Sequence, residues 1–313
     1  MRPNKKIGDG LILIILPFIL LLLGPSSVLG EKIVIDSDDQ LEFAHQTMER
    51  GDYDRAIGEF ERFIYFFPRN EKVPEAQYFI GECYLKAKRY ENARNALELV
   101  YKKYPRTVIA GKALFLMGES YYRQGVPKEA DYYYQKVIQE YPDTELRNAA
   151  FYRIGWTRME GSRWKEASEI LKGVEPTSPL YESAVDLSEK SLQGENLEYK
   201  SPAAAGVMAG ILPGLGHVYC NRYKDGLMAF LLNGSFIWAA VESFQENHDA
   251  LGGILLFLEL GWYSGNIYSA VNCAHKENRK RKEEFLKQLP DNLNLGLFTN
   301  GQGHLGLALK FDF

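Results

Sequence analysis

Two polar residues that could do chemistry stand inside long apolar stretches of the C-terminal third. Asn233 lies near the middle of the apolar segment 227–241, and Glu259 lies within the apolar segment 251–271. An acid inside a membrane segment points either to proton or ion handling or to a hydrogen bond that pairs two helices. We expect the pairing role, with Asn233 and Glu259 at similar depth and bonded across their helices.

Other reactive residue types are present without the spacing that catalysis or metal binding needs. Cys83, Cys220 and Cys273 form no CxxC pair, and His217 has no metal-ligand partner at useful spacing. The sequence contains no GxSxG, HExxH, Walker or glycine-rich dinucleotide motif. We therefore predict no enzyme activity, no cofactor and no metal.

Composition changes sharply along the 313 residues, whose net charge of −4 gives no indication of a nucleic-acid partner. Arg2, Lys5 and Lys6 precede an apolar run over residues 11–23, and small residues lead up to Glu31. This order is typical of a secretory signal peptide, here residues 1–30, with an uncleaved anchor as the alternative. Either form predicts that the rest of the chain is exported.

The polar stretch that follows contains an internal repeat with a period of 37 residues. Alanine recurs at positions 56, 93, 130 and 167, proline at 68, 105, 142 and 179, and glycine at 81, 118 and 155. Small residues let two antiparallel helices approach, large residues four positions after each alanine fill the space, and proline ends the second helix. Helix pairs of this kind must stack to bury their apolar faces, which predicts a solenoid.

The repeat resembles the tetratricopeptide family. Gly81-Glu82-Cys83-Tyr84 and Gly118-Glu119-Ser120-Tyr121 match its first helix, and an alanine, a large residue and a proline match its second. The family usually repeats every ~34 residues. The longer period is similar to that of periplasmic proteins such as the Tol–Pal-associated coordinator and an outer-membrane assembly lipoprotein. The resemblance implies four units and a cap over residues 37–198, the cap being a helix over 181–198.

The resemblance also implies a concave groove lined by the first helix of each unit. The residues that it would present are His45, Tyr78, Glu82, Phe115, Glu119, Tyr122, Tyr152 and Trp156. They would form a peptide-binding surface with aromatic anchors and two acidic contacts. Packing between repeats is the alternative for several of the aromatic side chains.

After Ser201-Pro202 the composition shifts to three apolar segments, residues 203–219, 227–241 and 251–271. The first contains Pro213 and several glycines, and the other two are marginal in length for membrane spans. Basic residues follow the first and third segments, and an acidic loop lies between the second and third. Loop charge therefore predicts a membrane domain of two or three helices over 203–274, with the repeats outside and the basic residues after 274 inside.

Two further patterns concern the C-terminal part. The stretch PGLGHVYCNRYKDG, from Pro213, resembles a small family of bacterial membrane hairpins, and its glycines suit a tight helix start or a close helix contact. Residues 275–313 begin as a basic segment and end in alternating apolar residues around Asn300-Gly301, which favours a β-hairpin. The terminal Phe313 resembles the recognition signal of outer-membrane β-barrels, so the outer membrane remains the alternative location.

Together these features predict an all-α protein: a tetratricopeptide-type α-solenoid, then an α-helical membrane domain and a short β-hairpin-like tail. We expect a scaffold, anchored in the inner membrane with its repeats in the periplasm, that mediates protein–protein interactions in cell-envelope assembly or maintenance. Two alternatives stay open: an outer-membrane-associated assembly factor, and a small transport or channel component that uses Glu259. The expected partners are a periplasmic protein or peptide, the lipid bilayer and, through the membrane helices, further copies of the chain.

Overall fold

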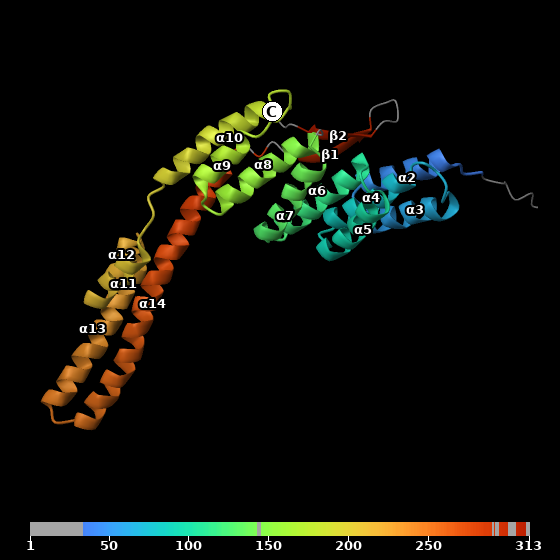
Figure 1. Cartoon of the computed structure of the whole chain (residues 1–313). Coiled ribbons are helices and arrows are strands. Elements are labelled where there is room, and N and C mark those ends of the chain that lie inside the picture. Colours follow the sequence, from blue (N-terminus) through green and yellow to red (C-terminus); the bar gives the residue numbers. More distant parts are fainter. Residues whose placement is uncertain (1–33, 143–144, 290, 292–293, 300–304, 311–313) are drawn as a thin grey trace, which may run out of the picture.

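The computed structural model of the protein describes residues 34–142, 145–289, 291, 294–299 and 305–310. The predicted signal peptide, residues 1–30, lies outside the described residues. An arc of short paired helices makes up one end of the molecule, and a long helical hairpin projects from the other (Figure 1).

Four antiparallel helix pairs build the arc, and α10 (Tyr181–Gln193) with the 3₁₀ turn η1 (Gly194–Asn196) closes it. The first helices of the pairs are α2 (Ser37–Glu49), α4 (Val73–Lys86), α6 (Val108–Arg123) and α8 (Glu145–Glu160). The second helices are α3 (Tyr53–Phe66), α5 (Tyr90–Lys103), α7 (Pro127–Glu140) and α9 (Trp164–Leu171). Consecutive helices pack together, and α6 also contacts α4 and α8. The predicted repeat solenoid is thereby confirmed.

The glycine column of the repeat lies where the two helices of a pair come closest. A Cβ atom added at Gly118 would lie 2.6 Å from the Tyr134 ring, and one at Gly81 would lie 2.6 Å from the Leu97 side chain. Gly155 has the same kind of contact in the last pair. Tyr134 and Leu97 are fully buried, so the predicted pairing of small and large residues is confirmed.

Proline ends the second helix in three of the four pairs. Pro68, Pro105 and Pro142 each stand two residues beyond the end of α3, α5 and α7. This is the expected effect of a residue that lacks the N–H group and restricts the residue before it. Pro179 is the exception, because α9 already ends at Leu171.

The three apolar segments fold into four helices: α11 (Pro202–Ile211), α12 (Leu215–Tyr219), α13 (Tyr223–Gln245) and α14 (Asp249–Lys287). A turn at Gly214, whose φ is +88°, divides the first segment into α11 and α12. α13 and α14 lie antiparallel along one another, and α11 and α12 pack against α14 (Figure 1). Among the described helices, α13 alone is long and apolar enough, by length and composition, to cross a membrane.

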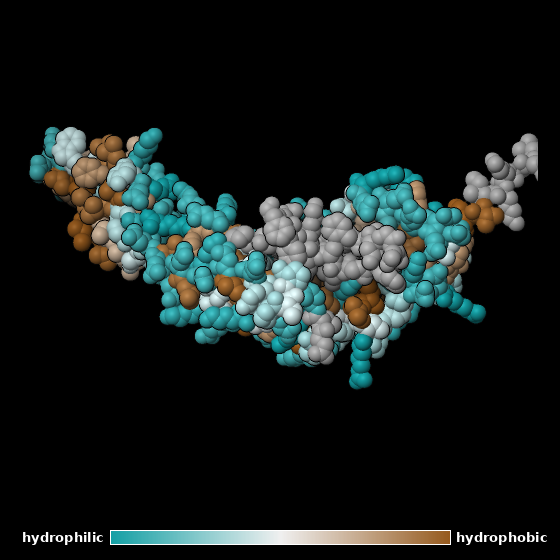
Figure 2. Space-filling view, turned by 90° about the horizontal axis from the view of Figure 1, so that it is seen from above, coloured by the Kyte–Doolittle hydropathy of each residue, from teal (hydrophilic) through white to brown (hydrophobic). Residues whose placement is uncertain are grey.

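The buried positions of the α13–α14 hairpin recur every seven residues. The residues in this series are Gly226, Asn233 and Ala240 on α13 and Gly252, Glu259, Asn266 and Cys273 on α14; Ser243, Ala270 and Ala274 are buried beside it. A seven-residue spacing is that of a left-handed helix pair with one narrow seam. The outward faces carry exposed apolar side chains such as Trp238 and Phe257, which gather at this end of the molecule in Figure 2.

α14 runs unbroken for 39 residues from the tip of the hairpin to the repeats. Its Phe285 ring packs edge-on against Trp164 with the centroids 5.5 Å apart, and Lys282 Nζ donates to the Glu160 carbonyl at 2.7 Å. The repeats and the basic segment therefore lie on the same side of any membrane that the hairpin enters. Residues 275–287 continue α14 and return to the array, whereas the loop-charge prediction had separated them from the repeats; the membrane topology itself stays a prediction.

Two short strands follow α14. β1 (Asn294–Thr299) and β2 (Leu305–Lys310) pair antiparallel, with Asn294 opposite Lys310 and Thr299 opposite Leu305. The terminal Phe313, on which the outer-membrane alternative depends, lies outside the described residues.

Candidate functional site

The first helices of the four pairs carry every residue predicted to line the groove. His45 lies on α2, Tyr78 and Glu82 on α4, Phe115, Glu119 and Tyr122 on α6, and Tyr152 and Trp156 on α8. Because α6 contacts both α4 and α8, these helices form one continuous face of the array. The side chains on this face divide into a packing set and a polar set.

His45 belongs to the packing set. Its ring lies between those of Phe60 and Phe79, with centroid distances of 5.2 Å and 4.4 Å. Burial, and to a lesser degree the charge of Lys72, lowers the pKa of His45 to about 4. The imidazole is therefore neutral at pH 7 and holds α2 against α3 and α4.

Tyr78, Phe115 and Tyr152 also serve packing. Each is at most 3% exposed, so none presents its ring to solvent. Phe115 packs against Tyr134 with the centroids 5.4 Å apart, and the Tyr152 hydroxyl shares a hydrogen bond of 2.9 Å with Ser183. For these aromatic side chains the structure supports the packing alternative that the sequence left open.

The polar set is centred on Arg153 of α8. Glu119 is fully buried, and its Oε1 accepts hydrogen bonds of 2.7 Å from both the Tyr134 hydroxyl and Arg153 Nε. Arg153 Nη1 also donates to the two carboxylate oxygens of Asp291, at 3.1 Å and 2.9 Å. Asp291 follows α14 in the sequence. The face formed by α4, α6 and α8, called the groove face below, therefore holds an acidic residue of the chain's own C-terminal segment.

Tyr122 extends this cluster to the end of α8. Its hydroxyl donates to Glu160 Oε1 at 2.8 Å, and its ring centroid lies 5.4 Å from the Arg153 guanidinium carbon. Burial, with Glu160 next in importance, raises the pKa of Tyr122, so this hydroxyl remains a donor at neutral pH. We call Glu119, Tyr122, Arg153 and Glu160 the arginine cluster.

Sequence reasoning missed Arg153, although the repeat contained a signal for it. The residues one and two periods earlier are Leu116 and Phe79, which are 4% and 1% exposed. An arginine in a buried column of a repeat needs a carboxylate partner to offset its lost hydration. Comparison along the column would have placed Arg153 inside the array and pointed to Glu119.

One column of the repeat offers unpaired polar atoms along this face. Within the described part of the chain, Glu82 Oε2, Glu119 Oε2 and Trp156 Nε1 are buried without a hydrogen-bond partner. The other oxygen of Glu82 pairs with Lys86 Nζ at 3.1 Å, and burial raises the pKa of this carboxyl group. A buried polar atom without a partner costs free energy, so these three atoms mark places where a ligand can add hydrogen bonds.

Asn233 and Glu259 lie on facing helices of the hairpin, and each is at most 3% exposed. The hydrogen bond expected between them is absent from the described residues. Asn233 Nδ2 donates to the Ala229 carbonyl of its own helix at 2.6 Å, and neither Glu259 oxygen has a partner. The Phe236 ring stacks on the Trp262 ring with the centroids 5.7 Å apart. Asn233 lines a pocket together with Asn266.

Comparison with known proteins bears on the repeats. Residues 41–106 and residues 112–144 each match a model described as a tetratricopeptide repeat. No curated protein matches the chain.

Solved structures similar to this chain include two repeat proteins of low identity. A tetratricopeptide repeat protein from Parabacteroides merdae is 14% identical, with 80% of this chain and 97% of that chain covered and a TM-score of 0.40. The Rap conjugation gene regulator of plasmid pLS20, solved with the Phr* peptide, is 14% identical, with 92% and 86% covered and a TM-score of 0.38. The repeat period, the glycine column and the family matches together make this chain a tetratricopeptide-repeat protein.

Proposed function

We propose that this protein is a membrane-anchored scaffold whose groove face binds an extended protein or peptide segment that carries an acidic side chain. Tetratricopeptide repeats mediate interactions with proteins and peptides. The observation that carries the finer proposal is the ion pair between Arg153 and Asp291, which are 138 residues apart. The arginine cluster thus already binds a carboxylate from a distant segment, and an external segment can compete for the same guanidinium. Binding, without catalysis, is the proposed role.

The unpaired column supports the same function along the rest of the face. Glu82 and Glu119 offer acceptor oxygens, and Trp156 offers an indole N–H donor. A peptide backbone carries both donors and acceptors at every residue, whereas a folded surface buries most of its own. An extended segment that crosses α4, α6 and α8 and displaces what covers these buried atoms can therefore offer them partners.

The test uses the chain's own acidic segment as a ligand in trans. A labelled peptide covering residues 286–295 is added to the full-length protein, either unchanged or as the Asp291→Asn variant. Loss of the internal carboxylate removes the competitor for Arg153 Nη1, so the variant should bind the peptide at least about tenfold more tightly, as expected for a hydrogen bond between charged groups. Fluorescence anisotropy measures the dissociation constant of each complex.

A peptide with asparagine at the position of Asp291 is the matched control, and it should bind both proteins equally weakly. Equal affinity of the acidic peptide for the two proteins would show that the Arg153–Asp291 contact is structural only. In that case the acidic specificity of the groove would be wrong.

We also propose that α13 and α14 enter the inner membrane as a hairpin, with the repeats and the C-terminal end in the periplasm. The signal-like N-terminus and the exposed apolar faces of the hairpin support this orientation. The basic end of α14 carries less weight as a topology signal, because some of its charges, such as those of Arg281 and Lys282, are engaged within the protein. Arg281 Nε pairs with Glu277 at 3.3 Å, and Arg281 Nη1 lies 3.8 Å from Glu198.

Single introduced cysteines test this orientation. The native Cys83, Cys220 and Cys273 are at most 4% exposed, so they should not react with a maleimide. In spheroplasts, an impermeant maleimide should label Lys172→Cys in the repeats and should label Glu246→Cys at the hairpin tip only after lysis. The reverse result would place the repeats in the cytoplasm. Labelling of both before lysis would exclude a spanning hairpin, and recovery with outer-membrane markers on a density gradient would favour the other membrane.

A further inference from the structure

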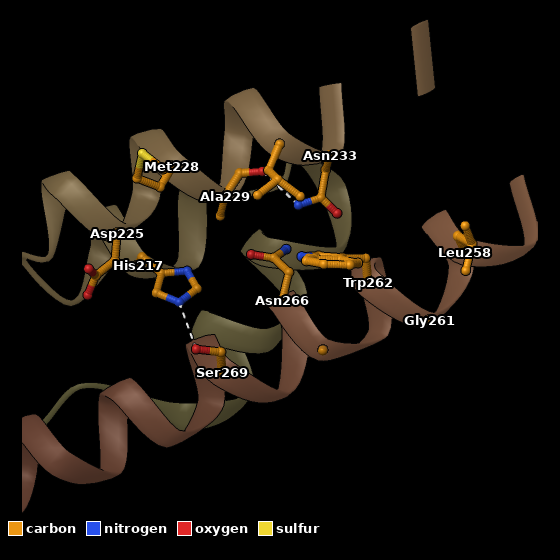
Figure 3. Close-up of a pocket in the computed structure, with 12 residues that line it drawn as sticks. His217, Asp225, Met228, Ala229, Asn233, Leu258, Gly261, Trp262, Asn266 and Ser269 are labelled. Carbon is orange, nitrogen blue, oxygen red and sulfur yellow. Dashed lines mark hydrogen bonds between the residues drawn. The ribbon is translucent and has the colours of Figure 1, made fainter. Parts of the chain in front are cut away.

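A pocket of about 630 Å³ lies between α12, α13 and the middle of α14 (Figure 3). His217 stands at one end and Asn233 at the other, with Asn266 and Trp262 between them. The remaining wall is mainly apolar and includes Met228. Three helices that are separate in the sequence thus converge on one cavity.

Two of the polar side chains leave hydrogen-bonding capacity unused. His217 is 4% exposed, and its Nε2 shares a hydrogen bond of 3.1 Å with Ser269 Oγ, whereas its Nδ1 has no partner among the described residues. Asn233 is 1% exposed, and its Oδ1 likewise has no partner. An unmade hydrogen bond at a buried atom costs about 1–3 kcal/mol, which a bound polar group would recover.

Asn266 shows that the unused capacity is specific to the other two residues. Its Oδ1 accepts from the Gly214 N–H at 3.4 Å, and its Nδ2 donates to the Ala209 carbonyl at 3.2 Å. The Asn266 side chain therefore fixes the turn between α11 and α12. It closes one wall of the pocket without competing for a ligand.

The charge of the wall limits what the pocket can take. No lysine or arginine lines it among the described residues, and its one carboxylate, Asp225, is paired with Arg222 at 2.5 Å. A phosphate-bearing head group would lose its hydration beside Asp225, and the nearby Arg222 is already paired with that carboxylate. A neutral head group with hydroxyl donors and acceptors fits Asn233 Oδ1 and His217 Nδ1.

We propose that this pocket binds a neutral glycerolipid of the diacylglycerol class. The glycerol head lies between His217 and Asn233, and the acyl chains lie along the exposed apolar faces of α13 and α14. Those faces include Leu231 and Leu258 beside the pocket, which are 51% and 47% exposed. The proposal needs the apolar hairpin to meet lipid but does not depend on the groove face.

The test places the full-length protein in phosphatidylcholine nanodiscs, since the choline head group offers no hydrogen-bond donor. A brominated diacylglycerol is titrated in, and quenching of Trp262 fluorescence is followed in a Trp238→Phe background. Quenching should saturate at a lipid mole fraction at least about tenfold below that needed for brominated phosphatidylcholine, as two recovered hydrogen bonds would give.

Two glycines of α14 provide a matched pair of variants. A Cβ atom added at Gly265, which lines the pocket, or at Gly253, which does not, meets no atom within 4 Å. Gly265→Leu should abolish the saturable quenching by filling the cavity, and Gly253→Leu should leave it unchanged. Asn233→Leu should weaken binding of the lipid by about fivefold to tenfold. The hairpin should stay folded, because the substitution removes a buried oxygen that has no hydrogen-bond partner.

Equal saturable binding in Gly265→Leu and in the unmodified pocket would overturn the proposal. So would tighter binding of a phosphatidic acid of the same chain length, which would show that the site selects a phosphate. Quenching by brominated diacylglycerol that never departs from that of brominated phosphatidylcholine would likewise exclude the site.

Discussion

Replacement of Arg153 by methionine is expected to lower the free energy of unfolding by about 3–5 kcal/mol, the cost of breaking a buried ion pair from one side. Glu119 has no exposed surface, so without Arg153 its carboxylate loses its hydrogen-bonded cation and keeps only the longer ion pair with Arg123 Nε, at 3.8 Å. Methionine keeps the apolar volume of the side chain, so the loss of unfolding free energy comes from the missing charge and not from a cavity. A thermal melt of the full-length protein, followed by circular dichroism, should shift down by about 6–20 °C.

Arg147 is the matched control, because it lies on the same helix and pairs with Glu175 near the surface, where the Glu175 side chain is half exposed. Arg147→Met should cost no more than about 1 kcal/mol, since exposed ion pairs contribute little. The double variant Arg153→Met with Glu119→Gln should recover part of the loss by removing the orphaned charge. A melt of Arg153→Met that matched the melt of Arg147→Met would contradict the central place of the arginine cluster.

Substitution of Gly214 by alanine is expected to cost about 3 kcal/mol or more, as the sum of a left-handed backbone penalty and overpacking. The φ angle of Gly214 is +88°, and an added Cβ atom would lie 2.0 Å from the Gly226 carbonyl oxygen. That obstacle is backbone, so relief requires α12 to move away from the start of α13. Packing of α12 on α14 should be lost with it.

Alkylation of Cys220 and Cys273 measures this loss, because the two thiols are 1% and 4% exposed in the folded helices. Their reaction with N-ethylmaleimide should become fast in Gly214→Ala. Gly234→Ala on α13 is the control, since its added Cβ atom meets nothing within 4 Å and replacing a helical glycine stabilises by up to about 1 kcal/mol. Thiols that stayed protected in Gly214→Ala would show that the turn tolerates a side chain.

The repeats could be predicted because their contacts are local and are made several times. Gly81 meets Leu97 within one unit, and Gly118 meets Tyr134 one period later, so the sequence presents the same contact in register. A prediction that rests on such columns averages over several copies. The close helix contacts expected from the Pro-Gly-Leu-Gly stretch were equally local. A Cβ atom added at Gly214 or at Gly216 would collide with a backbone oxygen of a neighbouring helix.

The return of α14 to the array could not be predicted in the same way. It joins residues far apart in the sequence, such as Lys282 and Glu160, and each contact is made only once. Loop charge separated the basic segment from the repeats, because a run of basic residues looks the same whether its charges face lipid head groups or pair with a folded domain. The groove prediction was limited similarly: its residues lie on the first helices of the pairs, but which of their aromatic rings pack inward depends on neighbouring helices.

With the hairpin in a bilayer as proposed, the unbroken course of α14 would fix the distance between the repeats and that bilayer. A helix rises about 1.5 Å per residue, so its 39 residues measure about 58 Å. About 20 residues are enough to cross the hydrocarbon core of a bilayer, which leaves roughly half of the helix as a rigid spacer between the core and the repeats. One residue inserted into this spacer would move the repeat array by about 1.5 Å along the helix axis and rotate it by about 100° around that axis. On the proposed anchoring, α14 would set both the distance from the membrane and the orientation at which the groove face meets its partner.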